Sequence, residues 1–148
     1  MNSITVIDAQ GGGMGKTVVR LLRAALPQAK IIAVGTNALA TSAMLRAGAD
    51  VGATGENAVA VGCANARVLV APIGLAFADA MYGEITAAMA LAFARSQAEK
   101  ILVPMKQCGV QVAGVPEWPL AQFLEEAVRL AVRAAQADDG GAPGRNVL

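Results

Sequence analysis

A run of glycines between a short apolar strand and an amphipathic helix is the feature of this sequence with the clearest chemical use. The run consists of Gly11, Gly12, Gly13 and Gly15, interrupted only by Met14. Glycine has no Cβ atom, so it can adopt left-handed turns and lets the backbone approach a ligand closely. The free N–H groups at the start of a helix attract anions. The run therefore predicts a turn that holds a phosphate group.

Polar residues around the glycine run extend this predicted site. Asp8 ends the strand before the run, where its carboxylate could bind a metal or a ligand hydroxyl, or could simply accept hydrogen bonds from loop N–H groups. The alternative for the whole turn is that its glycines only allow tight packing of the strand against the helix. The candidate binding residues are Asp8, Gln10, Gly11, Gly12, Gly13, Met14, Gly15, Lys16 and Thr17 in the first turn, Gly35, Thr36 and Asn37 after the second strand, and Pro72 and Gly74 after the fourth.

No catalytic group is predicted. The chain has no His, so a general base would have to be a carboxylate, Lys16 or a cysteine. Asp79, Tyr82 and Glu84 are interpreted as residues of a surface loop. The cysteines, Cys63 and Cys108, are far apart and are interpreted as structural thiols. Without His or a CxxC pair, no metal site is expected.

Alternating strand and helix patterns must position these turns. Short apolar, β-branched segments predict strands, and apolar residues at helical spacing predict helices between them. A helix from about residue 84 to 96 is expected before the fifth strand, and the last helix is expected to begin near residues 118–119. Thr54 could cap a short helix that runs from residues 54–57 to about Cys63, while Glu56 could face the edge of the predicted pocket. The predicted strands are at residues 4–7, 31–34, 49–53, 67–71, 100–104 and 110–114.

This alternation predicts an α/β fold with a doubly wound, mostly parallel, Rossmann-like sheet in a three-layer sandwich. The expected strand order is 3-2-1-4-5-6. Only a handful of residues separate the fifth and sixth strands, too few for a parallel crossover, so the last strand is expected to be antiparallel. In such sheets ligands bind beyond the carboxyl ends of the strands, where strands 1 and 4 diverge. The glycine run lies at that edge.

Composition limits the classes of partner. The chain has 148 residues, predicted to form a single nucleotide-binding domain at 1–137 and a flexible tail at 138–148. Its net charge of +1 and scattered basic residues argue against nucleic-acid binding. No stretch suits a membrane span or a leader, so a cytoplasmic protein is expected. Because 55% of residues are apolar and only 16% are charged, a homo-oligomer is expected as well.

Two local resemblances concern the first turn. Residues 12–17, Gly-Gly-Met-Gly-Lys-Thr, resemble the deviant phosphate loop of ATPases that partition chromosomes and place division sites. That resemblance implies that Lys16 meets the β- and γ-phosphates and Thr17 a magnesium ion. Residues 13–15 and the Pro-Ile-Gly segment at 72–74 are similar to the short-chain dehydrogenases, which implies a dinucleotide.

Over most of residues 3 to 115 the chain resembles a small bacterial family of unknown function. The resemblance is carried by a GQGGGxGK-like start, the Gly-Thr-Asn turn at 35–37, the Gly-Ala-Thr-Gly-Glu-Asn segment at 52–57 and the Pro-Ile-Gly turn. It implies the same fold and pocket location, and no particular activity.

The sequence thus leads to three hypotheses. The first is a small protein that binds NAD(P), another nucleotide or a related phosphate-bearing small molecule on the first turn, as a sensor or accessory subunit. The second is a degenerate nucleoside triphosphatase that uses Lys16 and Thr17. The third is a non-catalytic oligomeric scaffold whose glycine turn binds nothing.

Overall fold

The computed structural model describes residues 3–106 and 109–137, and it contains a five-stranded sheet whose paired neighbours all run parallel. The strands are β1 (Ser3–Asp8), β2 (Lys30–Gly35), β3 (Val51–Thr54), β4 (Val68–Pro72) and β5 (Glu99–Val103). Their order is β3-β2-β1-β4-β5, as expected for the first five strands. The predicted doubly wound α/β fold is confirmed.

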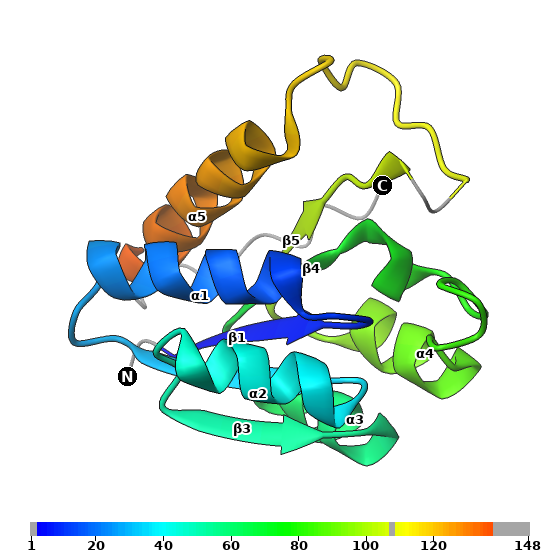
Figure 1. Cartoon of the computed structure of the whole chain (residues 1–148), viewed down its shortest axis with the longest axis horizontal. Coiled ribbons are helices and arrows are strands. Elements are labelled where there is room, and N and C mark those ends of the chain that lie inside the picture. The colour runs from blue at the N-terminus through cyan, green and yellow to red at the C-terminus, as the bar shows by residue number, and fades with distance from the viewer. Residues whose placement is uncertain (1–2, 107–108, 138–148) are drawn as a thin grey trace.

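Helices cover both faces of the sheet and complete a Rossmann-like three-layer sandwich (Figure 1). One face carries α1 (Gly13–Ala25), α2 (Ala38–Arg46) and α5 (Leu120–Gln136), with α1 between the other two. The other face carries α3 (Glu56–Asn65) and α4 (Ala87–Arg95). A short 3-10 helix, η1 (Ile73–Ala76), follows β4. Because α1 and α2 both begin at the carboxyl edge of the sheet, their N-terminal ends lie at the edge predicted to bind a ligand.

The central strand β1 contributes apolar side chains to both layers of the core. Ile4 and Val6 pack on the side of α1 and α5, and Ile7 packs on the opposite side, as expected from the alternation of side chains along a strand. On α1, Val18 and Leu22 are four residues apart and are fully buried against the first group. The turn that joins β1 to α1 is therefore held at both ends by core packing.

The predicted sixth strand is wrong. Residues 110–114 form no strand, and the described residues 109–119 before α5 are turns and irregular segments instead. Gly114 has a left-handed φ of 83°, and a turn joins the Val115 amide to the carbonyl of Val112. Pro116 has no amide hydrogen to donate to a neighbouring strand. These features end any extended pairing before it can form.

Two helix starts also differ from expectation. Thr86 caps α4 by accepting a hydrogen bond from the Met89 amide, so the helix begins after Glu84 instead of at it. At α3 the N-cap residue is Gly55, while the hydroxyl of Thr54 lies 2.7 Å from that of Thr41. The predicted tail at 138–148 and Cys108 lie outside the described residues.

At the opposite edge of the sheet, one carboxylate links α1 to β2. Asp50 Oδ2 accepts hydrogen bonds from the Ile31 amide at 2.8 Å and from the Arg23 guanidinium at 2.7 Å. Arg23 also donates to the carbonyl oxygens of Gly48 and Ala29. The bond from the Ile31 amide, followed by the bond and charge of Arg23, lowers the pKa of Asp50 below its ordinary value.

This lowered pKa predicts a pH-dependent effect of Asp50→Asn. A carboxylate whose pKa is lower in the folded state contributes stability above its ordinary pKa of about 3.9, and that contribution is lost as the pH falls through the folded value. The variant should therefore unfold at a lower urea concentration than the wild type at about pH 7, and the gap should narrow toward about pH 3. A gap of the same size at every pH would contradict the assigned role of the charge.

Candidate functional site

The carboxyl ends of β1 and β2 bring the first two predicted turns together. Asp8 is paired with Gly35 in the sheet, and the Thr36 amide donates to the Asp8 carbonyl at 3.0 Å. The side-chain amide of Asn37 donates to the carbonyl of Gln10 at 2.9 Å. The predicted residues after β4 are less closely connected. Pro72 and Gly74 are buried in β4 and η1, and the described residues show no hydrogen bond from either to the glycine turn.

The buried carboxylate of Asp8 holds the glycine turn from inside. It accepts hydrogen bonds from the Ala9 amide at 2.8 Å and the Gly15 amide at 2.7 Å. Of the roles considered for Asp8, the structure shows the bonding to loop N–H groups. Burial raises the pKa of Asp8 against the lowering effect of these two bonds, and the negative charge of Glu84 raises it further.

Three amide N–H groups of the turn remain available. The Gly12 amide donates to the Ala9 carbonyl at 3.1 Å. By contrast, the amides of Gly11, Gly13 and Met14 have no acceptor among residues 3–106 and 109–137. A Cβ atom added to Gly11 or Gly13 would meet no heavy atom within 4 Å. The start of α1 therefore presents unpaired donors beside open space.

Glu84 is a site residue that the sequence analysis placed in a surface loop. Its Oε1 atom accepts hydrogen bonds from the Gln10 amide at 2.8 Å, the Thr36 hydroxyl at 2.5 Å and the Asn37 side-chain amide at 2.6 Å. Partial burial raises the pKa of Glu84, but the bonds from Thr36, Gln10 and Asn37 together outweigh it and leave the pKa below its ordinary value. An ionised carboxylate thus lies where the first two turns meet.

The loop that carries Glu84 has an unusual backbone. Asp79, Met81 and Tyr82 have left-handed φ values of 66°, 57° and 58°, and Gly83 has 86°. The Asp79 amide donates to the carbonyl of Ile85, whose side chain is fully buried. The sequence indicated Glu84 as a site residue only indirectly, because its loop follows the strand next to β1, at the edge where doubly wound sheets bind ligands.

Asn37 links the start of α2 to this arrangement. Its Oδ1 accepts a hydrogen bond from the Ala40 amide at 2.9 Å, while its NH2 group donates to Gln10 and Glu84. Asn37→Ala removes both functions and should lower the free energy of unfolding by roughly 1–2 kcal/mol. Asn37→Ser keeps a capping oxygen, so urea unfolding should place it between the wild type and the alanine variant. Equal losses for the two variants would show that the cap contributes nothing.

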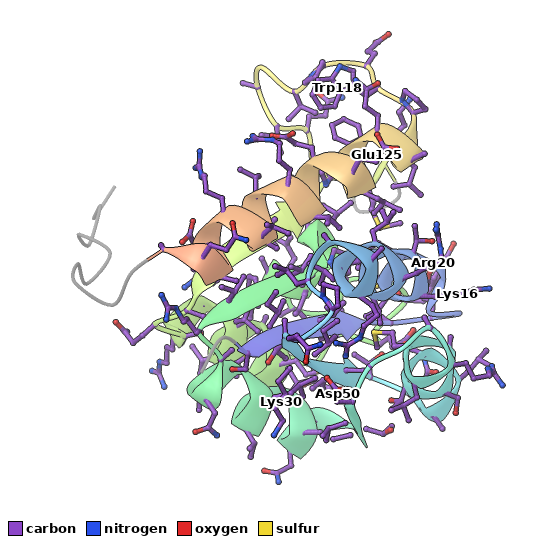
Figure 2. All side chains as sticks on the ribbon, turned by 90° about the vertical axis from the view of Figure 1, so that its left-hand side faces the viewer. Lys16, Arg20, Lys30, Asp50, Trp118 and Glu125 are labelled. Carbon is purple, nitrogen blue, oxygen red and sulfur yellow. The ribbon has the colours of Figure 1, made fainter. Side chains whose placement is uncertain are left out.

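The nucleoside triphosphatase hypothesis depends on Thr17 and Lys16, which both lie on α1. The Thr17 hydroxyl donates to the Gly13 carbonyl of its own helix at 3.1 Å. Lys16 is exposed and lines the groove between α1 and α2 with Arg20 and Arg46, a cavity of about 400 Å³. Figure 2 shows Lys16 and Arg20 projecting from the same side of α1. The basic side chains thus line the groove between α1 and α2.

Further features limit the chemistry of the described part of the chain. Burial raises the pKa of the Cys63 thiol to about 11, as expected for a structural thiol. Over the described ranges, no group of three or more Cys, Asp or Glu side chains is arranged to hold a metal ion. None of the described helices has the length and apolar character needed to cross a membrane.

Comparisons with known proteins identify the family and find distant structural neighbours. A dodecameric FMN-dependent UbiX-like decarboxylase from Escherichia coli O157:H7 is 14% identical, with a TM-score of 0.42 over 89% of this chain and 75% of that chain. AibC is 21% identical, with a TM-score of 0.47 over 91% of this chain and 40% of that chain. The comparison with curated proteins found no match.

These comparisons lend no support to the local resemblances to short-chain dehydrogenases and partitioning ATPases, nor to NAD(P) as the particular ligand. The wider resemblance to a family of unknown function is supported. A model of the domain of unknown function DUF3842 matches residues 3–136, nearly the whole of the described chain. The chain therefore belongs to the DUF3842 family.

Proposed function

We propose that this protein binds a phosphate-bearing small molecule of nucleotide type, with the phosphate on the amides of Gly11, Gly13 and Met14. The observation that supports this proposal most is that these three N–H groups have no acceptor among the described residues. A Cβ atom added to Gly11 or Gly13 would also meet no heavy atom within 4 Å, so there is open space beside two of them. They lie at the start of α1, a helix of 13 residues whose dipole favours negative charge there.

The two carboxylates of the site help to define where the phosphate binds. Asp8 already accepts hydrogen bonds from the Ala9 and Gly15 amides, and Glu84 accepts one from the Gln10 amide. A phosphate would be repelled from these positions, so the free amides on the α1 side are the ones open to it. Because both carboxylates are engaged in holding the turns, the role we propose is that of a sensor or accessory subunit.

Ligand-dependent stabilisation tests this function. Unfolding would be followed with ADP, NAD, flavin mononucleotide and inorganic pyrophosphate, and adenosine would serve as the control without phosphate. A ligand at a hundredfold excess over its Kd should stabilise the protein by about 2.7 kcal/mol. Mass spectrometry of the purified protein under native conditions would identify a ligand that stays bound. Stability unchanged by every phosphate compound would instead favour a scaffold whose glycine turn binds nothing.

We also propose that the chain forms a homo-oligomer. Apolar residues make up 55% of the sequence, and several apolar side chains near the start of α5 are exposed, among them Trp118 and Leu120. Figure 2 shows Trp118 at the far end of the molecule from Lys30 and Asp50. Sedimentation should give a mass that is a multiple of 14.9 kDa, and a mass of one chain would contradict the proposal.

A further inference from the structure

The Glu84 carboxylate has one oxygen that is fully engaged and one that is free. All three of its hydrogen bonds, from Gln10, Thr36 and Asn37, go to Oε1. The described residues give Oε2 no partner, and none of their buried side-chain oxygens is left unpaired. Oε2 is therefore in contact with solvent, at the same edge of the sheet as the free amides of α1.

The position of this carboxylate is fixed before any ligand arrives. Its three donors come from the turn after β1 and the turn after β2, so it is held from two sides. Its own backbone is anchored by the buried side chain of the next residue, Ile85. A carboxylate that needs no rearrangement loses little entropy when it accepts a further hydrogen bond.

The negative charge around Oε2 determines which kind of ligand group can bind next to it. Glu84 is ionised at neutral pH, and Asp8 lies close enough to be influenced by its charge. A phosphate oxygen would be repelled from this corner, whereas a hydroxyl group can donate a strong, charge-assisted hydrogen bond to it. A ligand group that binds next to Glu84 is therefore a hydrogen-bond donor, and the negatively charged phosphate binds at the free amides at the start of α1.

The sequence after β2 lacks an acidic residue that often has this role in other doubly wound sheets. In many doubly wound sheets an acidic residue near the end of the second strand accepts hydrogen bonds from the sugar hydroxyls of a nucleotide. Here that position reads Gly35-Thr36-Asn37 and has no acid. Glu84, from the loop before α4, places its carboxylate on Thr36 and Asn37.

We infer that Glu84 accepts hydrogen bonds through Oε2 from the vicinal hydroxyls of a ligand's ribose, so that the ligand is a ribonucleotide whose sugar hydroxyls are unmodified. This inference rests on the proposed phosphate site. It adds to that function the class of ligand and a residue that selects it.

The test compares inorganic pyrophosphate, ADP and 2′,3′-dideoxy-ADP by calorimetry on the wild type and on Glu84→Gln. The glutamine can still accept the three existing bonds, but at the Oε2 position it presents an amide NH2 group that cannot accept. Glu99→Gln, which removes the same charge from an exposed position in β5, is the matched control. Circular dichroism would establish that both variants are folded.

The wild type and Glu99→Gln should bind ADP about tenfold more tightly than the dideoxy analogue, the effect of a hydrogen bond to a charged acceptor. In Glu84→Gln the two nucleotides should bind within about twofold of each other, because ADP loses affinity. Pyrophosphate should not lose affinity.

Three other results would overturn the inference. If Glu84→Gln bound pyrophosphate and both nucleotides more tightly by the same factor, Glu84 would be an internal competitor of the ligand. If pyrophosphate bound but the ribose hydroxyls added nothing in the wild type, the inference would fail while the proposed phosphate site stood. Failure of all three compounds to bind would overturn the phosphate site and the inference together.

Discussion

Gly12→Ala should lower the free energy of unfolding by roughly 2–5 kcal/mol, a large part of the stability of a typical domain. Gly12 has a left-handed φ of 75°, which a side chain disfavours. A Cβ atom there would lie 2.7 Å from the Ala40 Cα and 3.2 Å from the Ala43 Cβ. Since the first of these is backbone, α2 would have to move away from α1.

The neighbouring glycine provides the control. Gly13→Ala places a methyl group where there is no heavy atom within 4 Å, at a residue without a left-handed φ. That variant should be as stable as the wild type, or more stable by up to about 1 kcal/mol, because alanine favours a helix more than glycine does. Urea unfolding of the two variants measures both effects. Equal destabilisation at the two positions would contradict the close contact between α1 and α2.

Gly13→Val should weaken phosphate binding about a hundredfold, the equivalent of losing two charge-assisted hydrogen bonds of about 1.5 kcal/mol each. The branched side chain would occupy the open space at Gly13, next to the Gly11 and Met14 amides, and should hinder a phosphate from reaching them. It makes no contact with the core, so unfolding should remain cooperative, and the free energy of unfolding should stay within a few tenths of a kcal/mol of the wild type because valine is no poorer a helix former than glycine.

Calorimetry with the phosphate compound that stabilises the wild type most would measure this loss. Gly13→Ala serves again as the matched variant, and its smaller side chain should reduce affinity less. Retention of wild-type affinity by Gly13→Val would mean that the phosphate does not bind at the start of α1.

Much of the fold could be predicted because it depends on local patterns. The segment 4–7 is apolar and β-branched, and the residues from Lys16 onward follow a helical period, so each unit can be recognised within a short window. The rule that crossovers between parallel strands are right-handed then gives the strand order. The same approach failed at residues 110–114, where the apolar pattern of a strand competes with Gly114 and Pro116 and the turn wins.

The candidate site was only partly predictable, since its polar contacts join residues that are far apart in the chain. Asp8 and the glycines are neighbours in sequence, and they were identified together. Glu84 is 74 residues from Gln10 and 48 from Thr36, and no local pattern relates it to them. Its role became visible only when the left-handed loop before α4 placed its carboxylate over the first two turns.

Binding of a phosphate to the unpaired amides at the start of α1 can be tested at individual residues. Amide nitrogen–hydrogen correlation spectra would be recorded by NMR during a titration with inorganic pyrophosphate. The largest saturable shifts are expected at Gly11, Gly13 and Met14, with smaller changes at Gln10, whose amide is bonded to Glu84. Shifts concentrated on Lys16, Arg20 and Arg46, with the three glycine-turn amides unmoved, would contradict the account and place the anion in the groove between α1 and α2.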